Sequence, residues 1–321
     1  MITKMKKIIY LFPLLLAFSS CQHDLVQEVS CRIDLDPVNT YTAGEPVRFL
    51  IHGNADNILF YSGETGAQYR FKDRYSVPVE QVKAASLKME YRPNYGYPGG
   101  LSVYVSNSFE GLKGDDGEAD RAAVAAMVEG GMQGWTRLDY DEGASAVWTS
   151  QDYDMSDYLD NLTVAIHWNP KNDGRSAQRT YWVNGSITID MEGTTPSNIT
   201  LADLNPVVVA MNTELDPYHK NAGNGSVRFD SSAAQMVFQG VGAGVLDYAI
   251  DAWIFTAPTP LNRVPNDKGA VLKNLQNYMD SFIYTYEKPG TYTASFVCIN
   301  ANYKGSSRFD VEMPVTIIEK F

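Results

Sequence analysis

The chain has 321 residues, 44% of them hydrophobic, which suits two or three domains with cores of their own. Its formal net charge is −12 at pH 7, and its lysines and arginines do not gather into a cluster. An acidic surface repels nucleic acid and anionic membranes, so the sequence excludes nucleic acid as a partner. The four histidines are isolated in the sequence and show no Cys/His zinc spacing.

Residues 1–20 have the pattern of a secretory signal peptide. Lysines at positions 4, 6 and 7 precede an almost wholly apolar run over residues 8–18, and Ser19-Ser20-Cys21 follows. This run is too short for a membrane span, and no other run approaches one. A cysteine directly after the apolar run resembles a bacterial lipobox, which implies that Cys21 becomes the acylated, membrane-anchored first residue. Ordinary signal cleavage, with Cys21 incidental, is the alternative.

Cleavage at this point removes three lysines and no acids, so the formal charge falls from −12 to −15. Residues 21–30 are then expected to form a polar tether between the lipid and the folded chain.

Alternation of apolar and polar residues predicts an all-β protein with little helix. The clearest alternating runs are residues 101–106, 162–168 and 180–190, in which one face packs into a core and the other meets solvent. Further strands are expected at 47–51, 58–61, 294–299 and 311–318. A helical turn is predicted at the Ala-rich residues 122–128, and a short helix at residues 268–279.

Two kinds of β-sandwich are suggested by resemblance. Residues 44–61 contain Gly-Glu-Pro-Val, a β-run, a Gly/Asn/Asp turn and an aromatic strand, and resemble the opening of a PKD-type, immunoglobulin-like sandwich. Residues 281–318 resemble its last strands. The block from 101 to 190 is similar to galactose-binding-like jelly-roll modules, a fold used for carbohydrate, adhesion and calcium alike.

These resemblances predict serial domains. We expect a PKD-like sandwich over residues 31–82, a jelly roll over 83–195 and a second PKD-like sandwich over 196–321, with a linker near 193–198. In the alternative layout, the C-terminal region completes the N-terminal sandwich around an inserted jelly roll.

Two stretches also resemble an uncharacterised family of Bacteroidetes-type surface lipoproteins. They are residues 54–66, which include Phe-Tyr-Ser-Gly-Glu-Thr-Gly, and residues 289–302, which begin with Pro-Gly-Thr-Tyr. Such proteins are encoded beside starch-utilisation-type outer-membrane glycan importers and their partner lipoproteins. The resemblance implies a lipid-anchored location at the outer membrane, facing the cell surface. Its motifs mark turns and strands, so it carries over no site residue.

The remaining cysteines, Cys31 and Cys298, both lie in predicted strands, far apart in sequence. A disulfide is permitted in an exported protein, but spacing alone does not establish one. We favour two half-buried free thiols.

One acidic loop is a candidate calcium site. Its four carboxylates fall within six residues, and Ca²⁺ takes six to eight oxygen ligands. The spacing is not that of an EF-hand, and a solvated loop is the simpler interpretation; no other cofactor is expected. The four residues are Asp115, Asp116, Glu118 and Asp120.

The strongest functional indication is aromatic. Phe, Trp and Tyr make up 12% of the chain, and many lie in polar, Gly-rich loops. Such rings can stack on the C–H faces of sugars while polar neighbours take the hydroxyls. Trp168, Trp182 and Trp253, within strand runs, are attributed to packing. The candidate glycan-binding residues are Tyr91, Tyr95, Tyr97, Trp135, Tyr140, Trp148, Tyr153 and Tyr158.

No catalytic motif is present. The sequence lacks a Gly-x-Ser-x-Gly elbow, a phosphate-binding loop, a dinucleotide fingerprint and His-Glu-x-x-His. We therefore expect a non-catalytic surface lipoprotein that binds a polysaccharide or oligosaccharide for an outer-membrane importer and its partner lipoprotein. The alternatives are an adhesin or structural subunit that binds protein and, third, a glycoside hydrolase using carboxylates near 139–142 and 152–154.

Overall fold

The computed structural model describes residues 25–37, 40–171, 173, 176–212, 225–244 and 249–320. This part of the chain is all-β, as predicted, and α2 is the one α-helix within it. The chain divides into two compact units, which are described separately. Unit 1 combines the two ends of the chain, up to Arg74 and from Asn266, whereas unit 2 spans residues 75–265.

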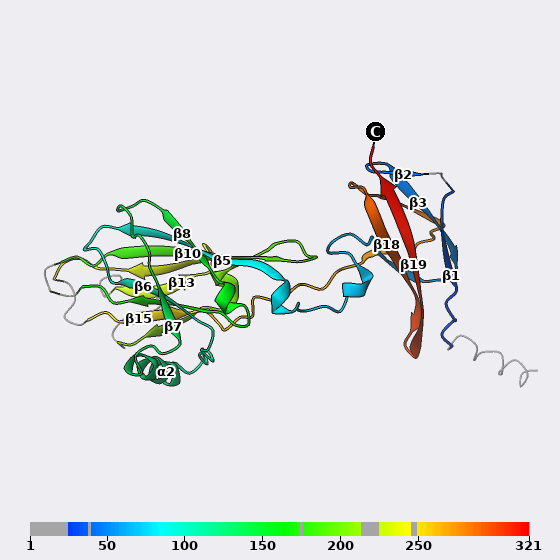
Figure 1. The fold of residues 1–321 in the computed structure, drawn as a ribbon. Helices are drawn as coiled ribbons and strands as arrows, with labels where there is room; N and C mark the ends of the chain where they lie inside the picture. The colour runs from blue at the N-terminus through cyan, green and yellow to red at the C-terminus, as the bar shows by residue number, and fades with distance from the viewer. Residues whose placement is uncertain are drawn as a thin grey trace, which may run out of the picture. The chain divides into compact units, whose positions relative to one another are not determined.

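Unit 1 is a β-sandwich built from both ends of the chain, so that blue and red ribbons lie together in Figure 1. Its sheets have the strand orders β1-β3-β17 and β16-β4-β18-β19-β2. The strands are β1 (Cys31–Leu35), β2 (Tyr41–Thr42), β3 (Pro46–Gly53), β4 (Asn57–Tyr61), β16 (Ala270–Lys273), β17 (Ser281–Thr285), β18 (Gly290–Asn302) and β19 (Gly305–Ile318).

The two ends of the chain share one core in unit 1. Phe49 and Phe60 from the N-terminal segment pack with Phe296 from the C-terminal segment, with ring centroids 5.0–5.7 Å apart. β3 pairs with β17, and β4 pairs with β18, so the segments also share both sheets. The three-domain layout favoured from the sequence is therefore wrong, and the chain has the alternative arrangement, with one sandwich interrupted by the other.

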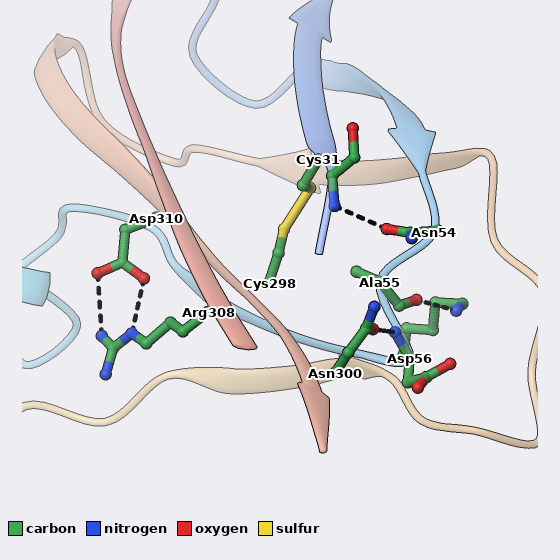
Figure 2. The surroundings of a disulfide bond; sticks show 10 residues. Cys31, Asn54, Ala55, Asp56, Cys298, Asn300, Arg308 and Asp310 are labelled. Carbon is green, nitrogen blue, oxygen red and sulfur yellow. Dashed lines mark hydrogen bonds and ion pairs between the residues drawn. A yellow bond between two sulfur atoms is a disulfide. The ribbon is translucent and has the colours of Figure 1, made fainter. Parts of the chain in front are cut away.

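A disulfide joins the same two segments (Figure 2). Cys31 on β1 and Cys298 on β18 are both buried, and their Cα atoms are 6.4 Å apart. The expectation of two free thiols is wrong, because the sandwich brings together two strands that the sequence separates by 267 residues.

Unit 2 is a larger sandwich. Its strands are β5 (Val82–Asn94), β6 (Leu101–Ser106), β7 (Trp135–Leu138), β8 (Thr149–Asp154), β9 (Thr163–Trp168), β10 (Thr180–Met191), β11 (Ser197–Thr200), β12 (Val207–Ala210), β13 (Ser226–Asp230), β14 (Gln235–Gln239) and β15 (Ala252–Phe255). One sheet has the order β13-β14-β10-β5-β8, with β11 also paired to β10, and the other has the order β12-β15-β9-β6-β7. We call them the β5 sheet and the β9 sheet.

The inner faces of these two sheets form the main core, which includes Leu87, Met89, Ile166, Trp168 and Val183. Helix α2 (Gly117–Glu129) covers the outer face of the β9 sheet, where Val124 packs against Trp253 and Phe255 (Figure 1). On β5, alternate residues Lys88, Glu90 and Arg92 face away from the core and are half-exposed.

Two local predictions were also wrong. The expected linker near residues 193–198 runs into β11, which pairs with β10 in a hairpin. The expected helix over residues 268–279 contains strand β16, whose pairing with β4 satisfies the backbone groups at the edge of that sheet. The helix predicted over 122–128 is present as part of α2.

Candidate functional site

The eight aromatic residues singled out from the sequence occupy different environments. Tyr91 is fully buried and belongs to the core of unit 2, so its interpretation as a stacking residue is wrong. Tyr140, Tyr153 and Tyr158 are partly buried against the same core. Trp135 packs beneath α2, with its ring 5.2 Å from that of Phe109. These four partly buried side chains contribute to packing within unit 2.

The other three, Tyr95, Tyr97 and Trp148, are 48%, 49% and 45% exposed. They lie at the end of the sandwich where β5 finishes and where β8 and β10 begin. Exposed aromatic rings that gather at one place on a surface are typical of recognition sites, so these three define the candidate site.

A buried ion pair holds the loop that carries Tyr95. Arg179 Nε donates hydrogen bonds to the carbonyl oxygens of Tyr95 and Gly96, at 3.2 and 3.3 Å. Its guanidinium forms a 2.9 Å ion pair with Glu142, and both side chains are less than one-fifth exposed. The Glu142 carboxylate also accepts a hydrogen bond from the backbone N–H of Gly99, at 3.1 Å. The loop is therefore fixed before any ligand arrives.

The same carboxylate accepts a hydrogen bond from the Tyr181 hydroxyl. Burial, together with this carboxylate, raises the pKa of Tyr181, so its hydroxyl stays protonated and continues to donate. Glu142 thus ties the loop to strand β10 through three separate partners: a guanidinium, a backbone amide and a phenol.

Large side chains lie on the outer face of the β5 sheet beside this loop. Arg92 on β5 is directly opposite Trp182 on β10, and its guanidinium carbon lies 5.2 Å from the centroid of the Trp182 ring. On the other side, β8 pairs with β5 up to Thr149 opposite Tyr91. Trp148 immediately precedes β8, so it lies outside the paired strand. β8 and β10 pair with the two sides of β5, and Trp148 and Trp182 therefore come from segments on either side of the strand that carries Arg92.

The loop before Trp148 is also attached to β5. The backbone N–H of Ala146 donates to the carbonyl of Pro93 at 2.6 Å, and Arg92 Nε donates to the carbonyl of Ala146 at 3.4 Å. Sequence reasoning missed Arg92 and attributed Trp182 to packing. We use the name aromatic surface for Arg92, Tyr95, Tyr97, Trp148 and Trp182.

Polar side chains continue from the aromatic surface along the sheet. Lys88 and Glu90 of β5 form a 2.8 Å ion pair, and Gln235 donates a 3.1 Å hydrogen bond to Asn184 of β10. The arrangement combines broad rings with both donors and acceptors of hydrogen bonds on one sheet face. Such a surface can hold the apolar faces and the hydroxyls of a sugar chain at the same time.

Two of the four carboxylates suggested for calcium, Asp116 and Asp120, have partners within the protein. Asp116 caps the N-terminus of α2 by accepting from the backbone N–H of Ala119 at 3.0 Å. Asp120 is buried and accepts from the backbone N–H groups of Lys113 and Gly114 at 2.8 and 2.9 Å. These carboxylates are committed to the start of the helix. Within the described ranges, no group of three His, Cys, Asp or Glu side chains is placed to hold a metal ion.

The carboxylates considered for hydrolysis have structural partners as well. Asp141 accepts from the backbone N–H of Gly143 at 2.9 Å, whereas Glu142 holds Arg179. Hydrogen bonds from the hydroxyl and backbone N–H of Ser156 lower the pKa of Asp154. Each of these three carboxylates therefore has a role in a turn or an ion pair.

Cys21 lies outside the described residues, as do residues 1–20, so the structure does not bear on the lipidation prediction. In the part of the chain that is described, no helix is long and apolar enough to cross a membrane.

The N-terminal part of the chain is similar to a known family. Residues 20–126, about a third of the chain, are similar to a family described as a domain of unknown function (DUF5017). This stretch covers β1 to β4 of unit 1 and continues into unit 2 through β5, β6 and most of α2. No curated protein matches the chain.

Proposed function

We propose that this protein is a non-catalytic binding protein for a polysaccharide or oligosaccharide. The observation that carries the proposal is the contact of Arg92 with Trp182 on the outer face of the β5 sheet, together with the exposed Tyr95, Tyr97 and Trp148 at the same end of the sandwich. The two indole rings, Trp148 and Trp182, offer platforms to more than one sugar ring of an extended chain. Arg92 beside Trp182 supplies donors for ring hydroxyls.

The loop held by Arg179 and Glu142 adds Tyr95 and Tyr97 at this end of the sandwich. The Lys171 ammonium lies 4.2 Å from the centroid of the Tyr97 ring, and the Thr180 hydroxyl donates to the Tyr95 hydroxyl at 3.3 Å. A binding surface that is already ordered loses little conformational entropy when a ligand binds.

The proposed setting follows from the sequence. Acylation at Cys21 would tether the protein to the outer membrane, and a surface-exposed anchor would keep captured glycan near an importer and its partner lipoprotein. Metabolic labelling with a fatty-acid analogue tests this point: the wild type should be labelled, and Cys21→Ser should not. Labelling of Cys21→Ser would refute lipidation at this residue.

Affinity electrophoresis of residues 22–321 through gels containing plant, host or microbial polysaccharides tests the binding function. Retardation by at least one polysaccharide is expected. Trp148→Ala should weaken retardation at least tenfold, about 1.4 kcal/mol, because it removes one of the rings that would stack on the sugar. Trp148 is exposed, so its loss should leave the core intact. Tyr278→Ala is the matched control, since Tyr278 is a 90% exposed aromatic residue of unit 1.

Failure of every polysaccharide to retard the wild-type protein would refute glycan binding and favour a protein-binding adhesin. Equal retardation of Trp148→Ala and wild type would refute the aromatic surface as the site. When the protein is incubated with the polysaccharide that binds, a reducing-sugar assay should detect no new reducing ends. Release of reducing ends would favour the glycoside hydrolase.

A further inference from the structure

Unit 1 contains a pocket that the aromatic surface does not include. It has a volume of about 380 Å³ and lies on the outer face of the sheet formed by β16, β4, β18, β19 and β2. Its floor is formed by Thr291, Thr293 and Ser295 of β18 and by Glu312 of β19, and its wall by Gln68, Tyr69 and Arg70. A volume of this order fits a small ligand.

The wall exists because the segment after β4 turns back over the sheet. Gly63 begins this turn, and its backbone N–H donates to the carbonyl of Ala67 at 2.9 Å. Its φ of +86° is a conformation that favours glycine, and a Cβ there would lie 2.6 Å from the carbonyl oxygen of Thr293. The Tyr286 hydroxyl donates to the carbonyl of Ser62 at 3.0 Å. The turn therefore lies directly against β18, and the Tyr286 hydroxyl fixes its first residues.

Tyr69 is held in place at one side of the pocket. Its ring packs edge-on against Tyr61, with centroids 5.3 Å apart, and its hydroxyl donates to Asp310. Arg308 binds both oxygens of Asp310, at 2.8 and 3.0 Å (Figure 2), and also donates to the Tyr69 hydroxyl. Tyr69, Arg308 and Asp310 thus use their hydrogen-bonding groups on one another, and the charges of Arg308 and Asp310 cancel. This side of the pocket is therefore rigid and carries no net charge.

Two polar side chains among those described at the floor of the pocket, Ser295 and Glu312, are free to form hydrogen bonds with a ligand. The Ser295 side chain is 2% exposed, and its hydroxyl has no hydrogen-bond partner among the described residues. Glu312, directly opposite Ser295 across the β18–β19 ladder, is exposed, and no ion pair or hydrogen bond of its carboxylate is found in the described part of the chain. A buried polar group without a partner is destabilising, so this floor is suited to a ligand that supplies hydrogen bonds.

We propose that this pocket is a second binding site, which takes one sugar residue, free or at the end of a chain. Hydroxyl groups of a sugar can donate to Glu312 and accept from Arg70, while the threonine hydroxyls do either. One carboxylate and one guanidinium on the lining balance in charge and favour a neutral ligand. The site lies wholly in unit 1 and stands whether or not the aromatic surface of unit 2 binds polysaccharide.

Saturation-transfer NMR on residues 22–321 tests the proposal with free glucose, galactose, mannose, xylose and N-acetylglucosamine as probes. At least one sugar should receive saturation. Titration of that sugar should show binding about tenfold weaker in Glu312→Gln and in Thr293→Val, because each removes a hydrogen bond to the ligand. Both positions are exposed, so the fold should survive, and a thermal melt checks this.

Two controls separate this site from the aromatic surface. Glu287→Gln, an exposed carboxylate of unit 1 outside the pocket, should bind the sugar as the wild type does. Trp148→Ala should also leave monosaccharide binding unchanged while weakening retardation by polysaccharide. The proposal is overturned if none of the five sugars receives saturation, if both pocket variants bind normally, or if only Trp148→Ala abolishes monosaccharide binding.

Discussion

Removal of the Cys31–Cys298 disulfide should destabilise unit 1 and leave unit 2 unchanged. The bond ties β1 to β18, two strands that come from opposite ends of the chain and belong to opposite sheets of the same sandwich. Replacing both cysteines with alanine suits their burial, since a small apolar side chain leaves no unpaired polar group.

The size of the effect follows from the loop that the bond closes. When unit 2 stays folded, the loop consists of residues 31–74 and 266–298, about 77 residues, with unit 2 as one link between them. The chain-entropy relation gives a stabilisation of about 4.5 kcal/mol for a loop of this length, within the usual range for native disulfides. For a unit of roughly 100 residues, this lowers the midpoint of thermal unfolding by roughly 20 °C.

The chain contains a convenient probe for separating the two units. All five tryptophans, at positions 135, 148, 168, 182 and 253, lie in unit 2. Tryptophan emission therefore follows unit 2 alone, whereas calorimetry detects both units. The Cys31→Ala/Cys298→Ala variant should shift a calorimetric transition that has no counterpart in tryptophan emission, and wild-type protein in reductant should behave in the same way. An equal shift in the tryptophan transition, or no shift at all, would refute this reasoning.

Three further predictions concern buried or paired carboxylates. Asp120→Ala should lower the free energy of unfolding of unit 2 by about 2–4 kcal/mol, because two backbone N–H groups lose their acceptor; Asp120→Asn should cost less, and added Ca²⁺ should not change the tryptophan melt of the wild type. Glu142→Ala should cost unit 2 about 3 kcal/mol or more in the same melt, since it leaves Arg179 buried without its partner, and it should weaken polysaccharide binding by releasing the loop that carries Tyr95. Partial burial opposes ionisation of Asp310, but hydrogen bonds from Arg308 and Tyr69 outweigh it and lower the pKa of this carboxyl. Its contribution to unit 1 should hence be complete at neutral pH and be lost as the pH falls through that lowered pKa, and calorimetry of Asp310→Asn should lack this acid-dependent loss.

Sequence alternation predicted most strands because it reports which face of a strand is buried. It could not predict which strand is the partner of which. β3 alternates in the same way whether it pairs with a neighbour in sequence or with β17, more than 220 residues later. The two-unit arrangement and the disulfide both depend on such long-range pairing, so the sequence could offer each only as an alternative and favoured the wrong one. The helix expected over 268–279 was wrong for a related reason, since strand β16 within it pairs with β4, a partner that the local sequence does not reveal.

The candidate site shows where the same alternation could have been used further. Tyr91 and Arg92 are neighbours on β5, and the strand period of two requires them to face opposite sides. Tyr91 shares its parity with Leu87 and Met89, whereas Arg92 shares its parity with Lys88 and Glu90. This parity alone assigns Tyr91 to the core and Arg92 to solvent.

The same argument applies to Trp182 on β10. Its neighbours Tyr181 and Val183 are both buried in the core, so Trp182 faces outward, where Arg92 lies opposite. An aromatic side chain on the same face of the sheet as charged residues does not pack into the core. Its presence on that face therefore needs another explanation. Loop position had selected residues such as Tyr140 that turn back onto the core. Loop position did identify Tyr95, Tyr97 and Trp148, and strand parity adds Arg92 and Trp182 to the aromatic surface, because a sheet fixes where a side chain points.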